Sequence, residues 1–175
     1  MRKSVRQLNP ILQRGLMAVI LLALPGPAGL SAEQAFRISS EDMVAIHADE
    51  AWEDIKPDIA HFAGHFDMRV RDLQLTADGA TLYGPLDNPD RMELNGSPAR
   101  LSLSHNLNDR PQTIEAEASE IVYERDAGTM SLIGSARLAQ GDNVLLSDII
   151  EYDVKSDRFH TKGRSGVQIK VQPRK

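Results

Sequence analysis

The chain has 175 residues, of which 41% are hydrophobic and 26% charged, a size and composition that suit one globular domain. Its formal net charge is −5 and it contains no cysteine, so its fold must be stable without disulfides. An acidic chain is poorly suited to binding nucleic acid, because that binding depends largely on neutralising phosphates.

The first 32 residues have the pattern of a secretory signal peptide. Four basic residues and no acidic one occupy positions 1–14, an apolar run of ten residues follows at 15–24, and small residues come after two prolines. This is the order of an export signal, and the run is shorter than the roughly 20 residues of a membrane-spanning helix. We expect cleavage after Ala32, or after Ala28. A retained membrane anchor is the alternative.

Cleavage would leave residues 33–175 as one exported domain. This part has 16 basic and 25 acidic residues, a net charge of −9, which disfavours simple adhesion to an anionic membrane surface. Its 143 residues are enough to bury a stable core. An export signal without cysteines fits a bacterial periplasm better than a eukaryotic secretory route.

Beyond residue 40, apolar and polar residues mostly alternate. The period of two is clear at 66–70, 101–104, 114–119, 121–123, 130–132, 150–152 and 167–171. Such alternation predicts strands with one buried face and one solvated face. Turn signals such as Asp78-Gly79, Asn95-Gly96 and Gly141-Asp142 separate the runs. We expect an all-β sandwich, jelly roll or barrel, with an α+β domain as the alternative.

A weak internal repeat runs through the domain. Residues 46–49 match residues 75–78 at a shift of 29, and the same shift carries Gly134 to Gly163. A unit of this size cannot bury its own apolar face and must stack on its neighbours. The segment 86–111 does not match the repeat, and we interpret it as a looser insertion.

Signals for an enzyme are poor. The sequence has no GxSxG, no HExxH, no phosphate loop and no cysteine nucleophile. His61 and His65 are four residues apart, which on a strand separates the side chains by about 13 Å, too far for one metal ion. We expect no metal and no cofactor. An envelope enzyme acting on glycans through two carboxylates remains an alternative.

The stretch from Gly134 to Asp153, GSARLAQGDNVLLSDIIEYD, resembles the repeat of the LptA/OstA-like family. That pattern has a glycine, alternating apolar residues, Gln-Gly-Asp, an apolar-small-Asp step and Ile-x-Tyr. The ending at 166–173 resembles the family's last strand, and residues 46–49 resemble an earlier small-Asp step. The resemblance covers about residues 40–173. It implies a slightly twisted, open antiparallel β-jelly roll, which is not an enzyme.

The resemblance also implies a function. Members of this family bind lipopolysaccharide through its lipid A acyl chains and join related jelly rolls into a bridge across the periplasm. We therefore expect a periplasmic lipopolysaccharide transport protein. The alternatives are an LptC-like protein of the same fold that keeps its membrane anchor, and a structural β-protein with a sealed core.

The expected partners are lipopolysaccharide, an LptC-like inner-membrane protein, an LptD-like outer-membrane translocon and further copies of the chain, joined head to tail. Open edge strands suit such assembly, because they can pair with the next protein. The N-terminal edge should meet the LptC-like partner through Met43, Val44 and Ile46. The C-terminal edge should meet the LptD-like partner or another copy through Val167, Ile169 and Val171.

Strand parity gives the residues expected to face inward, some of which should line a slot for lipid. Flexible aliphatic side chains suit fatty acyl chains, since each buried methylene contributes about 0.8 kcal/mol. The set is Ile46, Ala48, Phe66, Met68, Val70, Leu75, Leu101, Leu103, Ile114, Ile121, Tyr123, Met130, Leu132, Leu138, Leu145, Ile150, Tyr152, Phe159 and Ile169.

Overall fold

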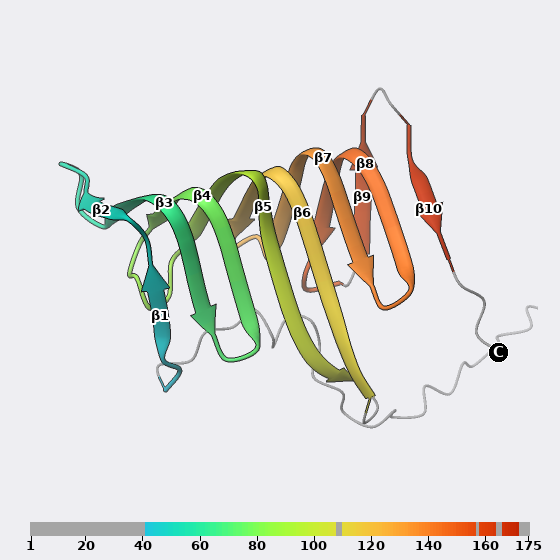
Figure 1. Ribbon diagram of the computed structural model, residues 1–175, viewed down its shortest axis with the longest axis horizontal. Coiled ribbons are helices and arrows are strands. Elements are labelled where there is room, and N and C mark those ends of the chain that lie inside the picture. Colours follow the sequence, from blue (N-terminus) through green and yellow to red (C-terminus); the bar gives the residue numbers. More distant parts are fainter. Residues whose placement is uncertain (1–40, 108–109, 157, 164–165, 172–175) are drawn as a thin grey trace, which may run out of the picture.

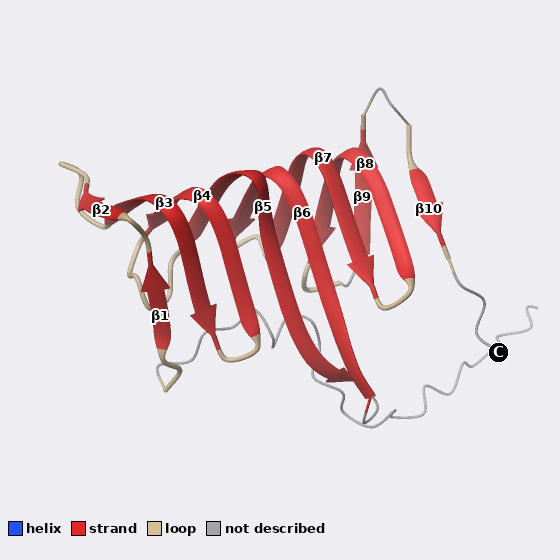
Figure 2. Cartoon of the chain, in the orientation of Figure 1, coloured by secondary structure: helices blue, strands red, loops and turns tan. Residues whose placement is uncertain are grey.

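A computed structural model describes residues 41–107, 110–156, 158–163 and 166–171, with residues 105–107 and 110–112 described by their backbone alone. The expected signal peptide lies outside these residues. All regular secondary structure in the described part is β (Figure 2), which confirms the all-β prediction. The strands are β1 (Val44–His47), β2 (Glu50–Glu53), β3 (Ile59–Val70), β4 (Leu73–Tyr83), β5 (Arg91–Leu107), β6 (Arg110–Glu124), β7 (Thr129–Gln140), β8 (Asn143–Asp153), β9 (Arg158–Lys162) and β10 (Gln168–Lys170).

The ten strands form one antiparallel sheet. Its order is β1-β3-β4-β5-β6-β7-β8-β10, with β2 also paired to β3 and β9 also paired to β8. The central strands follow one another as hairpins, so the sheet order repeats the chain order. Figure 1 shows the result: β1 and β2 lie at one end of an elongated molecule, and β9 and β10 lie at the other.

Register shifts at corresponding positions of neighbouring strands fold this sheet into two layers. The register shifts between Ala63 and Phe66 in β3, and further shifts fall at 76/79 in β4, 95/99 in β5, 117/120 in β6 and 133/136 in β7. A bulge bends its strand, and bulges at one level bend the whole sheet along a line, here called the fold line. In Figure 1 the strands curve over the top of the molecule at this line.

Each layer has its own pair of edge strands. β1 pairs with residues 67–70 of β3, and β10 pairs with residues 144–146 of β8, so both belong to one layer. β2 pairs with residues 60–63 of β3, and β9 pairs with residues 149–153 of β8, so both belong to the other. We call these the β1–β10 layer and the β2–β9 layer. The central strands β3 to β8 run through both.

The internal repeat of the sequence reflects the fold line. Gly64 and Gly134 have positive φ angles of 73° and 81°, and each lies against a side chain of the preceding segment. A Cβ atom at Gly64 would approach the Asp49 carboxylate to 2.2 Å, and one at Gly134 would approach the Ser119 hydroxyl to 2.8 Å. The same kind of contact joins Gly163 to Asp148. The small-Asp step and the glycine therefore recur because successive strands bend at the same level.

The core fills the space between the layers. Its largest fully buried side chains come from β3 to β8, and among the described residues no polar or charged side chain is buried. This apolar interior accounts for the alternation in the sequence. The fully buried large residues are Phe66, Met68, Leu75, Leu82, Leu94, Leu103, Ile121, Met130, Leu132 and Ile150.

The interpretation of residues 86–111 as an insertion is wrong. Residues 91–107 form β5, the longest strand, which lies in the middle of the sheet. Met92 and Leu94 of this strand are 5% and 1% exposed. Gly96, Ser97 and Pro98, which resemble a loop in sequence, fall on the fold line, where the ladder to β6 is interrupted. A bulge tolerates proline because the strand makes no ladder hydrogen bond there.

The sealed middle of the core predicts the effect of truncating one side chain. Leu132 is fully buried, so Leu132→Ala should lower the free energy of unfolding by about 2–5 kcal/mol through lost transfer energy and a cavity. Urea unfolding followed by circular dichroism measures this loss. Ser131→Ala, on the opposite face of β7, is the control and should change stability by no more than about 0.5 kcal/mol. Equal losses for the two variants would contradict the assigned inner face.

Candidate functional site

The inner face of the β1–β10 layer carries an apolar row that crosses the whole sheet. Directly opposed residues of neighbouring strands point to the same side of an antiparallel sheet. One residue from each strand of this layer therefore enters the row. Its members, from edge to edge, are Ile46, Met68, Leu75, Leu101, Ala116, Leu138, Leu145 and Ile169.

The β2–β9 layer carries two further inner rows. One consists of Ala51, Phe62, Ala80, Leu94, Ile121, Leu132, Ile150 and Thr161. The other consists of Glu53, Ala60, Leu82, Met92, Tyr123, Met130, Tyr152 and Phe159. Polar side chains occur in these rows chiefly at their ends, on the edge strands.

The interior is closed in the middle and open at both ends. Large hydrophobic side chains that are exposed cluster, among the described residues, at the two ends of the molecule. They are Met43, Trp52, Ile55 and Leu86 near β1 and β2, and Phe159, Val167, Ile169 and Val171 on or beside β9 and β10. Exposed apolar clusters of this kind mark binding surfaces. The apolar interior thus continues to an open mouth at each end.

A cavity of about 560 Å³ lies at the mouth near β2. Its lining includes Ala51, Ala60 and Phe62, which belong to the inner rows, and the loop residues Pro57 and Leu86. The volume is in the range of small-ligand sites, roughly 300–1,000 Å³. The inner rows therefore reach a cavity that is lined by apolar residues together with Glu53 and Asp58.

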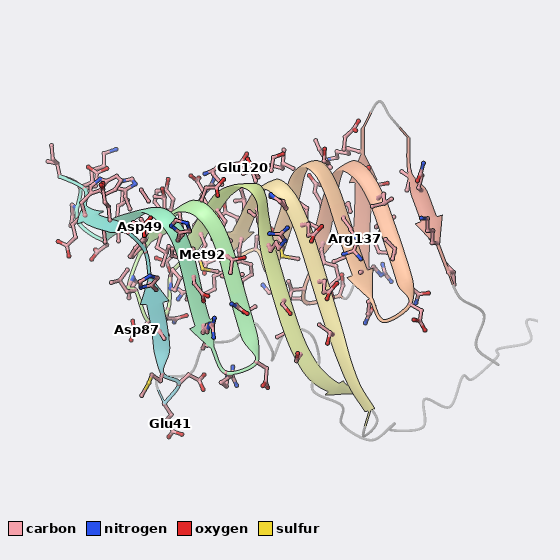
Figure 3. All side chains as sticks on the ribbon, viewed as in Figure 1. Glu41, Asp49, Asp87, Met92, Glu120 and Arg137 are labelled. Carbon is pink, nitrogen blue, oxygen red and sulfur yellow. The ribbon has the colours of Figure 1, made fainter. Side chains whose placement is uncertain are left out.

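The outer faces of both layers are solvated and charged. Arg100 and Arg137 pair with Glu117 and Glu115 of β6 at 3.2 and 3.5 Å, and Figure 3 shows Arg137 on β7 among the polar side chains of the front layer. Exposed ion pairs of this kind contribute at most about 1 kcal/mol each. Glu115 and Glu117 thus lie on the solvated face, and the apolar rows are the candidate functional surface.

A family model described as "LptA/(LptD N-terminal domain) LPS transport protein" matches residues 45–158, more than half of the chain. The chain belongs to this LptA-like family of lipopolysaccharide transport proteins. Its fold is similar to the crystal structure of LptH, the LptA homologous periplasmic component of the lipopolysaccharide transport device of Pseudomonas aeruginosa. The TM-score is 0.67 at 21% identity, covering 78% of this chain and all of that one. No curated protein sequence matches the chain.

This LptA-like chain places nearly all of its expected inward residues in or against the core. Those that are only partly buried are Ile46, Ala48, Tyr123 and Leu138, which pack against the cluster of buried residues. The other expected inward residues, apart from two on edge strands, are buried. Four of them lie in the β1–β10 layer outside the rows described above: Phe66, Val70, Leu103 and Ile114. Contact of any of these residues with lipid stays a prediction.

Two expected inward residues are not enclosed. Phe159 and Ile169 are 53% and 60% exposed, although they lie directly opposite buried Tyr152 and Leu145 on the inner side. The alternation of residues along the strand predicted the correct side of the sheet for both. However, both residues lie on edge strands, where no neighbouring strand shields their outer side from solvent. The sequence analysis also missed Phe62, Leu82, Met92 and Leu94. The alternation of Met92 and Leu94 around Glu93 was the available signal.

The expected partner edges lie at the two ends of the LptA-like fold. β1 and β10 are the terminal strands of one layer, and in the described chain each pairs with a single neighbour. Val44 and Ile46 belong to β1 and Met43 precedes it, while Val167 and Val171 flank β10 around Ile169. Such edges offer unpaired backbone groups for strand addition. β2 and β9 provide a second edge at each end.

The histidines of β3 serve local structure. His61 stacks on Trp52 with ring centroids 5.3 Å apart, and its two ring nitrogens contact Thr81 and Asp54 at 3.2 and 3.3 Å. His65 contacts the Asp49 carboxylate through Nδ1 at 2.7 Å. No group of three or more acidic, histidine or cysteine side chains in the described residues is arranged to hold a metal ion. The described residues also form no helix that could span a membrane.

The pair of His65 and Asp49 predicts a pH-dependent contact at the fold line. The hydrogen bond that His65 donates to the Asp49 carboxylate, together with the negative charge of that carboxylate, raises the pKa of His65 above its ordinary 6.5. The contact therefore stabilises the fold below pH 6.5 and loses that effect as the pH rises through the raised pKa. Asp49→Asn should move the His65 titration measured by NMR back toward 6.5. Asp54→Asn, beside His61, is the control; an unchanged His65 titration in Asp49→Asn would contradict this assignment.

Proposed function

We propose that this LptA-like protein works in the periplasm, holds the acyl chains of lipid A between its two layers, and forms part of a bridge carrying lipopolysaccharide from the inner to the outer membrane. The continuous inner rows, which run from one open edge to the other, carry this proposal. They give acyl chains an apolar surface along the whole molecule. Export of the chain and cleavage after Ala32 belong to the same proposal.

The way the layers are joined supports entry of lipid. The strands that pass through both layers join them at the fold line, whereas away from this line the contact consists of packed side chains. Parting the layers there breaks no β-ladder in the described chain. An acyl chain then exchanges one set of apolar contacts for another, so the energetic cost is that of rearranged packing.

The open edges support assembly with partners of related fold. We propose an LptC-like protein at the β1 edge, and an LptD-like translocon or a further copy at the β10 edge. Strand addition would extend the sheet and align the inner rows of successive proteins. The bridge needs no cofactor for this step, because burial of apolar surface and backbone pairing supply the binding energy.

Two alternatives differ from this proposal in specific ways. An LptC-like protein would share the fold but keep residues 1–32 as an anchor, so N-terminal sequencing of the exported protein separates the two. An envelope enzyme acting on glycans would need two converging carboxylates at a catalytic distance. Membership in a transport family favours neither alternative, and we propose that the chain has no catalytic role.

Depletion of the protein should interrupt transport. If the protein is part of the bridge, newly made lipopolysaccharide should accumulate at the inner membrane, because its acyl chains cannot cross water unshielded. Pulse labelling followed by membrane fractionation measures this. Re-expression of the intact chain should restore delivery. Delivery to the outer surface at the normal rate during depletion would exclude the proposal.

Charges on the inner rows should reduce lipid or partner binding. Leu145→Asp and Ile46→Asp each place an unpaired charge where apolar groups pack, which is costly. We expect less lipopolysaccharide copurified with either variant and weaker photocrosslinking to it from neighbouring inner positions. The matched controls are Leu146→Asp and Ala45→Asp, the next residues along β8 and β1, which face outward by register.

Circular dichroism checks that each variant folds. Ile46 is only half-buried at the edge, so Ile46→Asp should fold even if Leu145→Asp does not. Normal binding by folded Ile46→Asp, or equal losses in variants and controls, would contradict the proposed lipid path.

A further inference from the structure

Two cross-strand rows on the outer face of the β2–β9 layer have the same chemical order. They lie on β7, β8 and β9, next to the β9–β10 end (Figure 1). In each row a hydroxyl on β7 is opposite a carboxylate on β8, which is opposite a nitrogen base on β9. The first row is Thr129, Asp153 and Arg158, and the second is Ser131, Glu151 and His160.

These two rows line one cavity of about 600 Å³. Ser156 in the turn before β9 adds a third hydroxyl, and Tyr152 and Phe159 complete the lining. The volume is large enough for a sugar residue with its substituents. Tyr152 and Phe159 are also the last two members of an inner row. Because β9 is the edge strand of its layer in the described chain, the cavity lies beside the mouth of the apolar interior.

The bonds within the protein keep the acidic groups of the cavity in place as hydrogen-bond acceptors. Asp153 accepts a hydrogen bond from the Ser156 backbone at 2.8 Å, which lowers the pKa of Asp153 below its ordinary value. Glu151 accepts one from Lys162 at 2.9 Å. A carboxylate has about four lone-pair sites, so each group can accept further hydrogen bonds from a ligand.

The basic side of the cavity carries a cationic side chain, Arg158, that can bind an anion. Arg158 lies directly opposite Asp153, but within the described residues it forms no ion pair with Asp153 or with any other carboxylate. A guanidinium group binds phosphate or carboxylate through two parallel hydrogen bonds. The cavity thus offers acceptors and hydroxyls in its middle and a cation at one edge.

We propose that this cavity binds an anionic saccharide. Asp153 and Glu151 would accept hydrogen bonds from sugar hydroxyls, while Arg158 would hold a phosphate or carboxylate substituent. The proposal rests on the proposed function, because lipopolysaccharide supplies such a sugar on the same molecule as its acyl chains. A lipid whose acyl chains enter the interior beside Phe159 has its head group next to the cavity. The outer face would then hold the saccharide while the inner rows hold the lipid.

Binding of acyl-free ligands tests this site directly. The probe is the phosphorylated oligosaccharide released from lipopolysaccharide by complete deacylation, titrated into the purified protein by calorimetry. Arg158→Gln and Ser131→Asn should each weaken binding about tenfold, the size expected from one lost charge-assisted contact or one blocked subsite. Arg137→Gln, which removes the same charge from the outer face of the other layer, is the matched control and should bind as the unchanged protein does.

Two further ligands separate a saccharide site from a plain anion site. The dephosphorylated oligosaccharide should bind more weakly than the phosphorylated one but still measurably, and Arg158→Gln should reduce its affinity less than that of the phosphorylated one. Inorganic phosphate alone should bind far more weakly than either. Phosphate binding as tight as that of the oligosaccharide, no oligosaccharide binding at millimolar concentration, or an equal loss in Arg137→Gln would overturn the proposal.

Photocrosslinking separates the failure of this site from the failure of the proposed function. Arg158→Gln should leave crosslinking of lipid A from the inner position 145 unchanged, because that row lies on the other layer. Lipid crosslinking without oligosaccharide binding would remove the saccharide site alone. Oligosaccharide binding without lipid crosslinking would keep the site and remove the lipid path.

Discussion

The bend that β3 to β8 share at the fold line determines the rest of the structure. Because each of these strands belongs to both layers, the layers cannot slide past one another, and they stay joined at the fold line along the whole molecule. The small residues at this line permit the bend: Gly64 and Gly134 adopt positive φ angles and leave no space for a Cβ atom. One apolar interior, crossing every strand, follows from this constraint.

The open ends follow from the same geometry. The sheet closes on itself through the fold line and not through pairing of β1 with β10, so edges remain at both ends of the described chain. Exposed edges normally promote aggregation. Here the edge strands carry charges, for example Glu50 and Glu53 on β2 and Lys170 on β10. Charged edges limit pairing to partners whose side chains and register fit, as the proposed assembly with an LptC-like protein at one end and an LptD-like protein at the other requires.

Much of the fold was predictable from the sequence, because alternation reports directly which side of a strand is buried. Ile121 and Met130 were assigned correctly for this reason. Alternation does not report how many strands cover a residue, so the exposure of Phe159 and Ile169 escaped it. Residues 86–111 were misread since Gly96 and Pro98 signal a loop in sequence, whereas the aligned bulges that accommodate them appear only when neighbouring strands are in register.

The outer cavity escaped prediction for a related reason. Thr129 is 24 residues before Asp153, Arg158 is five residues after it, and the three meet only through two cross-strand registers. No local sequence motif indicates such a row. Each residue, taken alone, resembles any other polar residue on the solvated face of a strand. By contrast, the inner rows repeat the same apolar chemistry along the central strands. The inward residues of one strand therefore indicate which residues of the next strand face inward.

The uniformity of the inner rows suits the proposed lipid path. Equivalent apolar rows would let an acyl chain exchange like contacts from strand to strand, as the proposed lipid path requires. The closed middle of the interior is compatible with passage because Met68, Met92 and Met130 lie there, each no more than 5% exposed. Unbranched methionine side chains repack around guests of irregular shape. In the proposed lipid path, the resting protein excludes water from its interior and admits lipid when the layers part on the side away from the fold line.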